Sequence, residues 1–199
     1  MNIFCVGSVE VLLSTYENYA AETIYAKNLG NKTYIIKASQ TPDLQYFTYD
    51  YGGFSYPDFK IFLLSILWRV IISESFHTPD IDKDIIENLP RLIYNHDPLN
   101  YDNFGCVLQV IKYKKGHIAG GFILEPFLTK NDNILVLNIL IDGFMYSFYL
   151  NSEILPEKKK RFFLKPDGTM TIVGRTIFQD KGLFEMIKKA YDFFKRSNK

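Results

Sequence analysis

The sequence predicts an α+β protein, in which N-terminal helices surround a buried central helix and pack on a mostly antiparallel β-meander, with a C-terminal helix closing the chain. Three observations predict it: a continuous apolar segment at residues 57–75, strand-like runs joined by Gly-containing turns after residue 104, and an amphipathic segment at residues 181–196. Because the strands follow the helices rather than alternate with them, this order favours an antiparallel sheet with helices on one face.

The composition is that of a chain with ample material for a packed core. Of its 199 residues, 47% are hydrophobic and 16% aromatic. We expect a single domain over residues 1–199, with a helical part over about 1–103 and a sheet part over about 104–199. The formal net charge is only +1, so the overall charge does not favour binding to nucleic acid or to anionic lipid.

The cysteines and the N-terminus predict a cytoplasmic protein with no membrane partner. Cys5 and Cys106 lie far apart, so they provide neither a disulfide framework nor zinc-ligand spacing. The first basic residue is Lys27, so no charged region precedes the short apolar run at residues 3–6. A signal peptide is therefore not expected.

The central helix has a clear start and an apolar surface on nearly every side. Pro57 suits the first helical turn, and Asp58 favours the positive end of the helix dipole. A helix that is apolar all round is either buried or membrane-spanning. Lys60 and Arg69 lie inside the segment, and each would cost about 2.5–3.5 kcal/mol at the centre of a bilayer. We therefore expect a buried core helix.

Arg69 attracts particular interest because it lies beside Trp68 in the most apolar helix of the chain. A long side chain can extend outward to solvent, and that is the simplest account. If Arg69 is buried it needs a partner, and we expect an interior ion pair with Glu17. Removing one member of such a pair typically costs about 3–5 kcal/mol.

The segments before the central helix are expected as follows. An amphipathic helix covers residues 9–27, with Ser8 as N-cap and Gly30 as its stop. A short strand is expected at residues 32–38. Residues 39–56 carry Pro, Asp and a Gly pair, and they are expected to form a loop.

Beyond the central helix, a second amphipathic helix is expected over residues 80–89, with Pro90 kinking it or starting a new turn. Three hairpins are then expected. The first joins residues 106–113 to 117–125, the second joins 134–141 to 144–150 around Asp142-Gly143, and the third joins 162–164 to 169–173 around Asp167-Gly168. Asp-Gly is the strongest of these turn signals, since both turn positions need positive φ. A helix over about 181–196 closes the chain.

No metal or cofactor site is expected. His77, His96 and His117 occur singly, whereas metal sites usually show paired ligands at short spacing. The acidic run at residues 80–84 resembles the start of a calcium loop, but Ile85 stands where that loop needs glycine. The sequence contains no phosphate loop, dinucleotide fingerprint or nucleophile elbow.

Two groups of residues are candidates for partner binding. One is a set of aromatic side chains in the expected loop, and the other is the only concentrated basic run. These residues are Tyr46, Tyr49, Tyr51, Lys158, Lys159, Lys160 and Arg161. They predict a protein partner or self-association, with nucleic acid as a further option through the basic run. The alternative is that the rings cover the core and the basic run is a solvated linker.

Two segments resemble an uncharacterised bacterial family with an HNH-like, zinc-knuckle N-terminus. The segments are residues 10–19 (EVLLSTYENY) and residues 59–69 (FKIFLLSILWR). In that family a C-x-x-C-E knuckle precedes the first segment. Here the two cysteine positions fall on Val6 and Val9, which cannot ligate zinc. The resemblance therefore implies the body of such a protein without the parts that would cleave DNA.

We expect a non-catalytic bacterial cytoplasmic protein that acts by binding, as an accessory in a phage-defence or mobile-element locus. The first alternative is a diverged metal-dependent nuclease or other phosphodiester hydrolase. It would need carboxylates to converge with a basic residue and a metal; the candidates are Glu17, Arg69, Glu74, Asp80 and Glu125. The second alternative is a small-ligand sensor with a pocket between sheet and helices.

Overall fold

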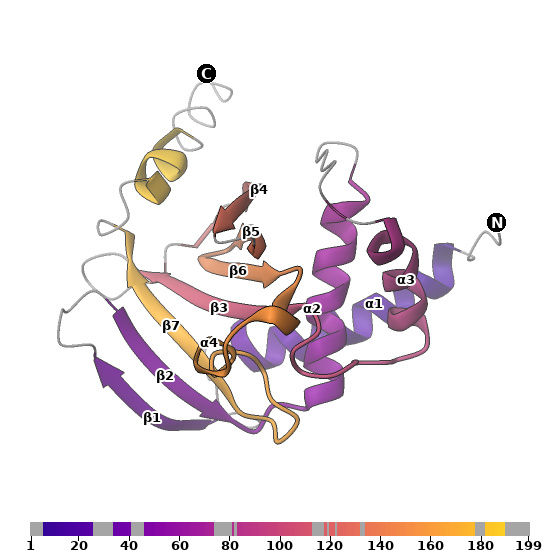
Figure 1. Ribbon diagram of the computed structural model, residues 1–199, viewed down its shortest axis with the longest axis horizontal. Helices are drawn as coiled ribbons and strands as arrows, with labels where there is room; N and C mark the ends of the chain where they lie inside the picture. Colours follow the sequence, from indigo (N-terminus) through magenta and orange to yellow (C-terminus); the bar gives the residue numbers. More distant parts are fainter. Residues whose placement is uncertain are drawn as a thin grey trace.

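The computed structural model describes residues 6–25, 34–40, 46–73, 81, 83–112, 118, 120–121, 123–131, 134–177 and 182–189. It confirms the α+β class, with helices packed on a seven-stranded sheet (Figure 1). No helix within these ranges combines the length and the apolarity that crossing a membrane requires.

The central helix is α2, Tyr56–Ile71. Pro57 lies in its first turn, as expected, and Ser55 is the N-cap. Every residue from Phe59 to Leu67 is buried. Helices α1 (Val6–Ala20) and α3 (Lys83–Tyr94) both pack on it.

Two helix boundaries differ from the sequence prediction. Helix α1 begins at Val6 rather than after Ser8, and a π-helical turn at Ala21–Tyr25 continues it. Helix α3 begins at Lys83, contains Pro90 and runs on to Tyr94, so the residues after Pro90 belong to the same helix. Proline removes one backbone hydrogen bond, but Leu89 and Ile93 on either side of it are buried in the core, and that packing maintains the helix.

The sheet has the strand order β1-β2-β7-β3-β6-β5-β4. The strands are β1 (Tyr34–Gln40), β2 (Tyr46–Gly52), β3 (Gly105–Lys112), β4 (Ile123–Asn131), β5 (Ile134–Ile141), β6 (Phe144–Tyr149) and β7 (Met170–Thr176). All neighbouring pairs are antiparallel except β3 with β7. The strands β4, β5 and β6 form a meander, whereas β7 is inserted between β2 and β3.

One of the three expected hairpins forms in full. The β5–β6 hairpin turns at Asp142 and Gly143, whose φ angles of 48° and 80° match the expected turn. Strands β3 and β4 do not pair. A single antiparallel bridge joins Lys112, at the end of β3, to Ile118, and the expected turn between them lies outside the described residues. The turn at Gly168 exists, but residues 162–164 are not a strand, because β7 pairs with β2 and β3 instead.

The expected loop over residues 39–56 is also wrong, because β2 lies within it. Strand β2 is rich in Tyr, Phe and Thr, which favour strands. It is paired on both sides, with β1 and with β7. The Pro and Gly residues that suggested a loop stand outside the strand or at its end.

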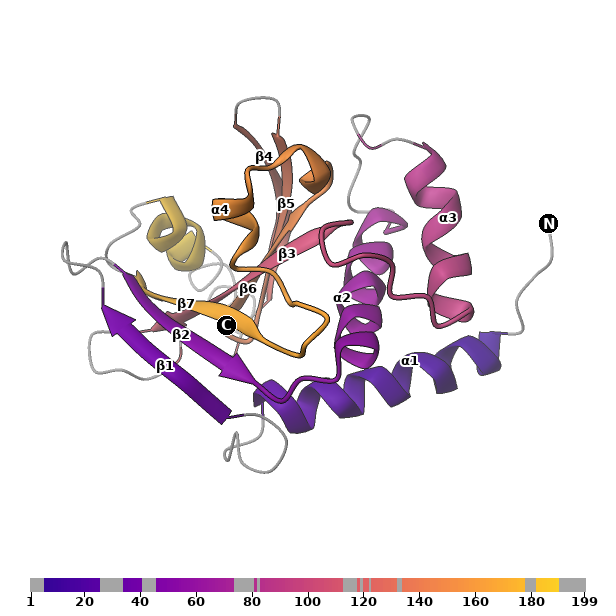
Figure 2. The ribbon, with the colours of Figure 1, turned by 60° about the horizontal axis from the view of Figure 1, so that its bottom comes forward.

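Successive side chains of a strand point to opposite faces of the sheet, and the two faces are covered differently. One face joins residues of α1, α2 and α3 in the largest hydrophobic cluster, which includes Leu13, Leu64, Leu89, Leu108 and Tyr146. On the other face lie two smaller clusters. One of these clusters includes Leu183 and Ile187 from helical residues 182–189. The other includes Leu155 and Phe163. Figure 2 shows α1–α3 and these covering segments on opposite sides of the sheet.

Candidate anion-binding groove

The predicted Glu17–Arg69 ion pair exists, but it is not interior. The Arg69 guanidinium contacts the Glu17 carboxylate and so joins α2 to α1. The two side chains are 41% and 45% exposed. Arg69 lies in the last turn of α2, beyond the fully buried stretch, and its side chain reaches solvent there.

The other enzyme candidates do not assemble into a site with this pair. Glu125 is exposed on β4, at the far edge of the sheet, while Glu74 and Asp80 lie outside the described residues. Among the residues whose positions are described, no group of three or more His, Cys, Asp or Glu side chains could hold a metal ion. Cys106 is buried, and burial raises the pKa of its thiol, which makes it a poor nucleophile.

Only one of the three histidines, His96, lies in the described ranges. Its Nδ1 atom is 2.5 Å from the Tyr16 hydroxyl, and its Nε2 atom is 3.7 Å from an Asp58 carboxylate oxygen. These contacts connect the end of α3 to α1 and α2. His77 and His117 lie outside the residues that the structure describes.

The aromatic candidates are strand residues rather than loop residues. Tyr51 is buried in the core, and Tyr49 is half-buried beneath Lys112, whose Nζ atom lies 4.9 Å from the ring centroid. Lys112 also donates a hydrogen bond to the Tyr49 hydroxyl. The Tyr46 side chain is outside the described set. Tyr49 and Tyr51 therefore belong to the sheet and its core, not to an accessible aromatic surface.

The basic run forms the short helix α4, Glu157–Lys160, and the residue that follows it. Lys158, Lys159 and Arg161 are exposed, whereas Lys160 is buried. Its Nζ atom lies 3.1 Å from Asp102 Oδ2 and 3.2 Å from Glu157 Oε1. The hydrogen bond with Asp102 raises the pKa of Lys160. Lys160 therefore fixes the position of the basic run through its two ion pairs, and it is not available to bind a partner.

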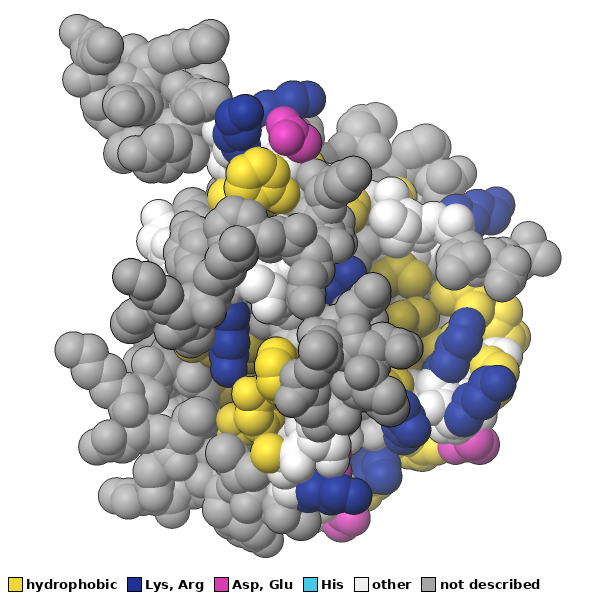
Figure 3. All heavy atoms as spheres, turned by 90° about the vertical axis from the view of Figure 1, so that its left-hand side faces the viewer, with side chains coloured by type: hydrophobic (Ala, Val, Ile, Leu, Met, Phe, Trp, Pro, Cys, Tyr) yellow, Lys and Arg dark blue, Asp and Glu magenta, His cyan; other side chains and the backbone are white. Residues whose placement is uncertain are grey.

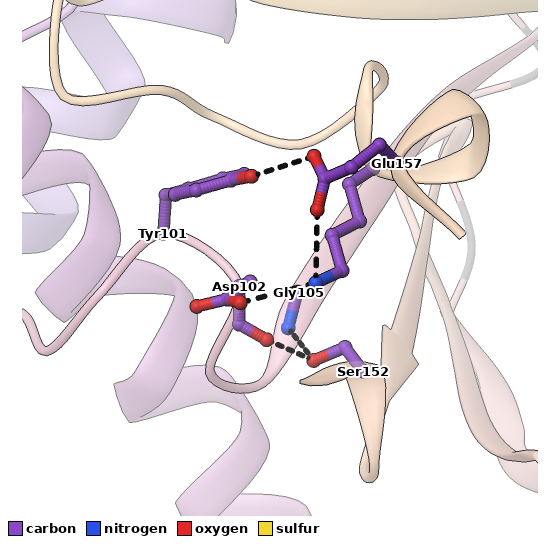
Figure 4. A network of polar contacts seen from close by, with 6 residues as sticks. Tyr101, Asp102, Gly105, Ser152 and Glu157 are labelled. Atoms are coloured by element: carbon purple, nitrogen blue, oxygen red, sulfur yellow. Dashed lines mark hydrogen bonds and ion pairs between the residues drawn. The ribbon is translucent and has the colours of Figure 1, made fainter. Parts of the chain in front are cut away.

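Lys160 belongs to a network that fixes α4 against the turn before β3 (Figure 4). The Tyr101 hydroxyl donates to Glu157 Oε2 at 3.0 Å. Ser152 donates to the carbonyl oxygen of Asp102 and accepts the Gly105 backbone N–H at 2.8 Å. A Cβ atom at Gly105 would lie 2.1 Å from the Phe163 ring, so only glycine permits this close approach. The network holds the residues that follow α4 in a fixed position.

A groove of about 540 Å³ lies between these residues and the edge of the sheet. The sheet contributes a cross-strand row, because Lys37 of β1 pairs with Asp50 of β2, and Asp50 pairs with Thr171 of β7. Ser39 and Thr48 form the adjacent row. The groove is lined by Lys37, Ser39, Thr48, Asp50, Arg161, Phe162, Lys165, Thr169, Met170 and Thr171.

The groove combines three cations with several hydroxyl groups. Arg161 lies over the Phe162 ring, 4.6 Å from its centroid, and within the described part of the chain neither Arg161 nor Lys165 forms an ion pair. Within the described part of the lining the single carboxylate is that of Asp50, which accepts a hydrogen bond from Thr171 at 2.6 Å. Figure 3, which looks onto the side carrying β1 and β2, shows Lys and Arg side chains gathered in the lower right part of the face.

This arrangement suits the binding of a phosphate-like anion. Arg and Lys side chains supply charge-assisted hydrogen bonds, and the hydroxyls of Ser39 and Thr48 supply neutral donors. The other two hydroxyls, of Thr169 and Thr171, donate to Asp167 and Asp50. The basic run marks Arg161 in the sequence, whereas Lys37, Lys165 and Thr171 were not predicted. No local signal marks them, because strand pairing and the turn at residues 165–168 bring them together.

Comparison of the chain with protein-family models, with curated proteins and with solved structures found no match. The resemblance to an HNH-related bacterial family stays a prediction.

Proposed function

We propose that this protein is a non-catalytic binding protein that holds a phosphate-bearing ligand in the groove between the residues that follow α4 and the sheet edge. The observation that carries the proposal is the convergence of Lys37, Arg161 and Lys165 with the hydroxyls of Ser39 and Thr48 in a hollow of about 540 Å³. That volume lies in the usual range for ligand sites, about 300–1,000 Å³.

Binding without catalysis is supported by the chemistry of the lining. Phosphoryl or phosphodiester hydrolysis needs a positioned base, usually with a metal ion to stabilise the developing charge. Asp50, the only carboxylate among the lining residues that the structure describes, is hydrogen-bonded to Thr171. The accessory role in a bacterial defence or mobile-element locus stays a prediction of the sequence resemblance.

The first test measures the binding of a short polyphosphate, which carries phosphate groups and no bases, by isothermal titration calorimetry at several salt concentrations. We expect the double variant Arg161→Gln/Lys165→Gln to bind at least tenfold more weakly at low salt. In a plot of log affinity against log salt concentration, the slope for this variant should be smaller in magnitude by about one for each phosphate contact that is lost.

The matched control is Lys83→Gln/Arg91→Gln, which removes one Lys and one Arg from exposed positions on α3. It changes the net charge equally and should keep the affinity within about twofold. Equal losses in the two double variants would show non-specific charge attraction and would refute the groove. Phosphate release from the polyphosphate with Mg²⁺ or Mn²⁺ present would instead favour the enzyme alternative.

A further inference from the structure

A second hollow of about 430 Å³ lies beside the groove, on the other side of Arg161 and Lys165. These two basic residues line both hollows. The second hollow is lined by Tyr101, Glu157, Lys160, Arg161, Lys165, Pro166 and Asp167. The two hollows therefore form one surface that is divided by a pair of cations.

The second hollow differs in character from the groove. Its apolar lining residues are Tyr101, whose aromatic ring is half-buried, and Pro166. The hydrogen bond from the Tyr101 hydroxyl to Glu157 fixes the orientation of the aromatic ring. Glu157 and Asp167 supply acceptor oxygens at the border, although Glu157 also pairs with Lys160, and Asp167 accepts hydrogen bonds from Thr169.

We propose that the complete surface binds single-stranded nucleic acid, with a backbone phosphate between Arg161 and Lys165 and a neighbouring base on the Tyr101 ring. Across the two hollows the surface offers an aromatic ring for a base, a pair of cations for a phosphate, and a groove lined by hydroxyl groups for the next phosphate and sugar. Single-strand binders combine a basic groove with aromatic side chains on which bases stack. In a duplex the base faces are stacked on one another, so a duplex offers only its backbone.

This inference rests on the proposed function and adds a binding site for a nucleobase to the site for phosphate. The test compares a twelve-nucleotide oligo(dT), the matching duplex and a polyphosphate of similar charge, all by fluorescence competition at fixed salt. We expect oligo(dT) to bind at least fivefold more tightly than either competitor. If polyphosphate binds as well as oligo(dT), the base site is refuted while phosphate binding stands; if none of the three binds, the proposed function fails as well.

Two substitutions of Tyr101 separate base stacking from structural damage. Tyr101→Phe keeps the ring and loses the hydrogen bond to Glu157, whereas Tyr101→Leu loses both. We expect Tyr101→Leu to weaken oligo(dT) binding by about five- to fiftyfold and Tyr101→Phe by less than about threefold. Both variants lose the hydrogen bond to Glu157, so any effect of that loss on polyphosphate affinity should be equal in the two, whereas the additional loss of oligo(dT) affinity should occur only in Tyr101→Leu. Equal losses of oligo(dT) affinity in the two variants would refute stacking on this ring.

An oligonucleotide carrying 2-aminopurine gives an independent spectroscopic signal. Stacking of that base on Tyr101 should lower its fluorescence on binding to the wild-type protein and to Tyr101→Phe, but not to Tyr101→Leu. The same quenching in all three proteins would place the base elsewhere and overturn the proposal.

Discussion

Lys60 is the residue whose environment departs most from that of a typical lysine. It lies in the second turn of the central helix and is 2% exposed. Its Nζ atom donates to the carbonyl oxygen of Asn103 at 2.5 Å, and the Phe104 carbonyl oxygen is 3.4 Å away. Burial lowers the pKa of Lys60 to about 8. The same turn is held from the other side by the buried Lys160, through Asp102.

The lowered pKa of Lys60 makes stability depend on pH in a definite direction. Below pH 8 the amine is charged in both folded and unfolded chains, so the full cost of burying the charge is present. Between pH 8 and 10.5 the unfolded chain holds a proton that the folded protein has released. Stability therefore rises with pH across this window, by about 3 kcal/mol for the whole shift.

We predict that Lys60→Met abolishes this pH dependence. The free energy of unfolding, measured by urea titration between pH 7.5 and pH 10, should rise by about 2 kcal/mol in the wild-type protein relative to the variant. Burial raises the pKa of Tyr16, Tyr51 and Tyr56 and so lowers stability at high pH, but that effect is common to both proteins and cancels. If the free energy of unfolding changed with pH equally in the wild-type protein and in Lys60→Met, Lys60 would not be the source of the pH dependence.

At the scale of elements, the sheet is crossed by a row of hydrogen-bonded polar side chains, one from each of five neighbouring strands. Arg175 donates to Gln109 at 3.2 Å, and Gln109 donates to Ser147 at 3.1 Å. Ser147 in turn donates to Asn138 at 2.8 Å, and Asn138 donates to Thr129 at 3.1 Å. This row separates the two smaller hydrophobic clusters, and Ser147 and Asn138 within it are buried.

We predict that the members of this row are energetically coupled. Ser147→Ala removes a donor to Asn138 and an acceptor for Gln109, and it should cost about 1–3 kcal/mol because buried polar groups lose a partner. Asn138→Leu alone should cost a similar amount. The double variant should be less destabilised than the sum of the two by about 1 kcal/mol, which a double-mutant cycle in urea measures. Strict additivity would show that the contacts are independent.

Elements with a strong local signal could be predicted from the sequence, and elements defined by distant pairing could not. The central helix is visible because its burial requires an apolar surface all round, and the β5–β6 turn because Asp142-Gly143 permits positive φ. The β3–β4 hairpin was a wrong prediction, since local turn signals do not show that β7 pairs alongside β3. Of the residues that line the groove, the sequence indicated only Arg161, because β1 and β2 complete the groove from the other half of the chain.

At the scale of the whole molecule, the sheet ties the two halves of the chain together. Strands β1 and β2 belong to the half predicted to be helical, yet β2 pairs with β7, with Tyr46 opposite Arg175 and Tyr51 opposite Met170. The largest hydrophobic cluster also includes residues from both halves. A fragment of residues 104–199 would therefore leave one side of β7 unpaired and one face of the sheet uncovered.

We predict that neither residues 1–103 nor residues 104–199 fold alone. Each fragment loses the main-chain bonds between β2 and β7 and the burial of the shared cluster, and these losses exceed the stability of about 5–15 kcal/mol typical of a domain. Thermal unfolding followed by circular dichroism should show a cooperative transition for the full chain and none for either fragment. The fragments mixed at equal concentration provide the control, because a regained transition would show that the halves complete one sheet. A cooperative transition of residues 104–199 alone would show instead that the sheet half is an independent domain and that β1 and β2 only extend its edge.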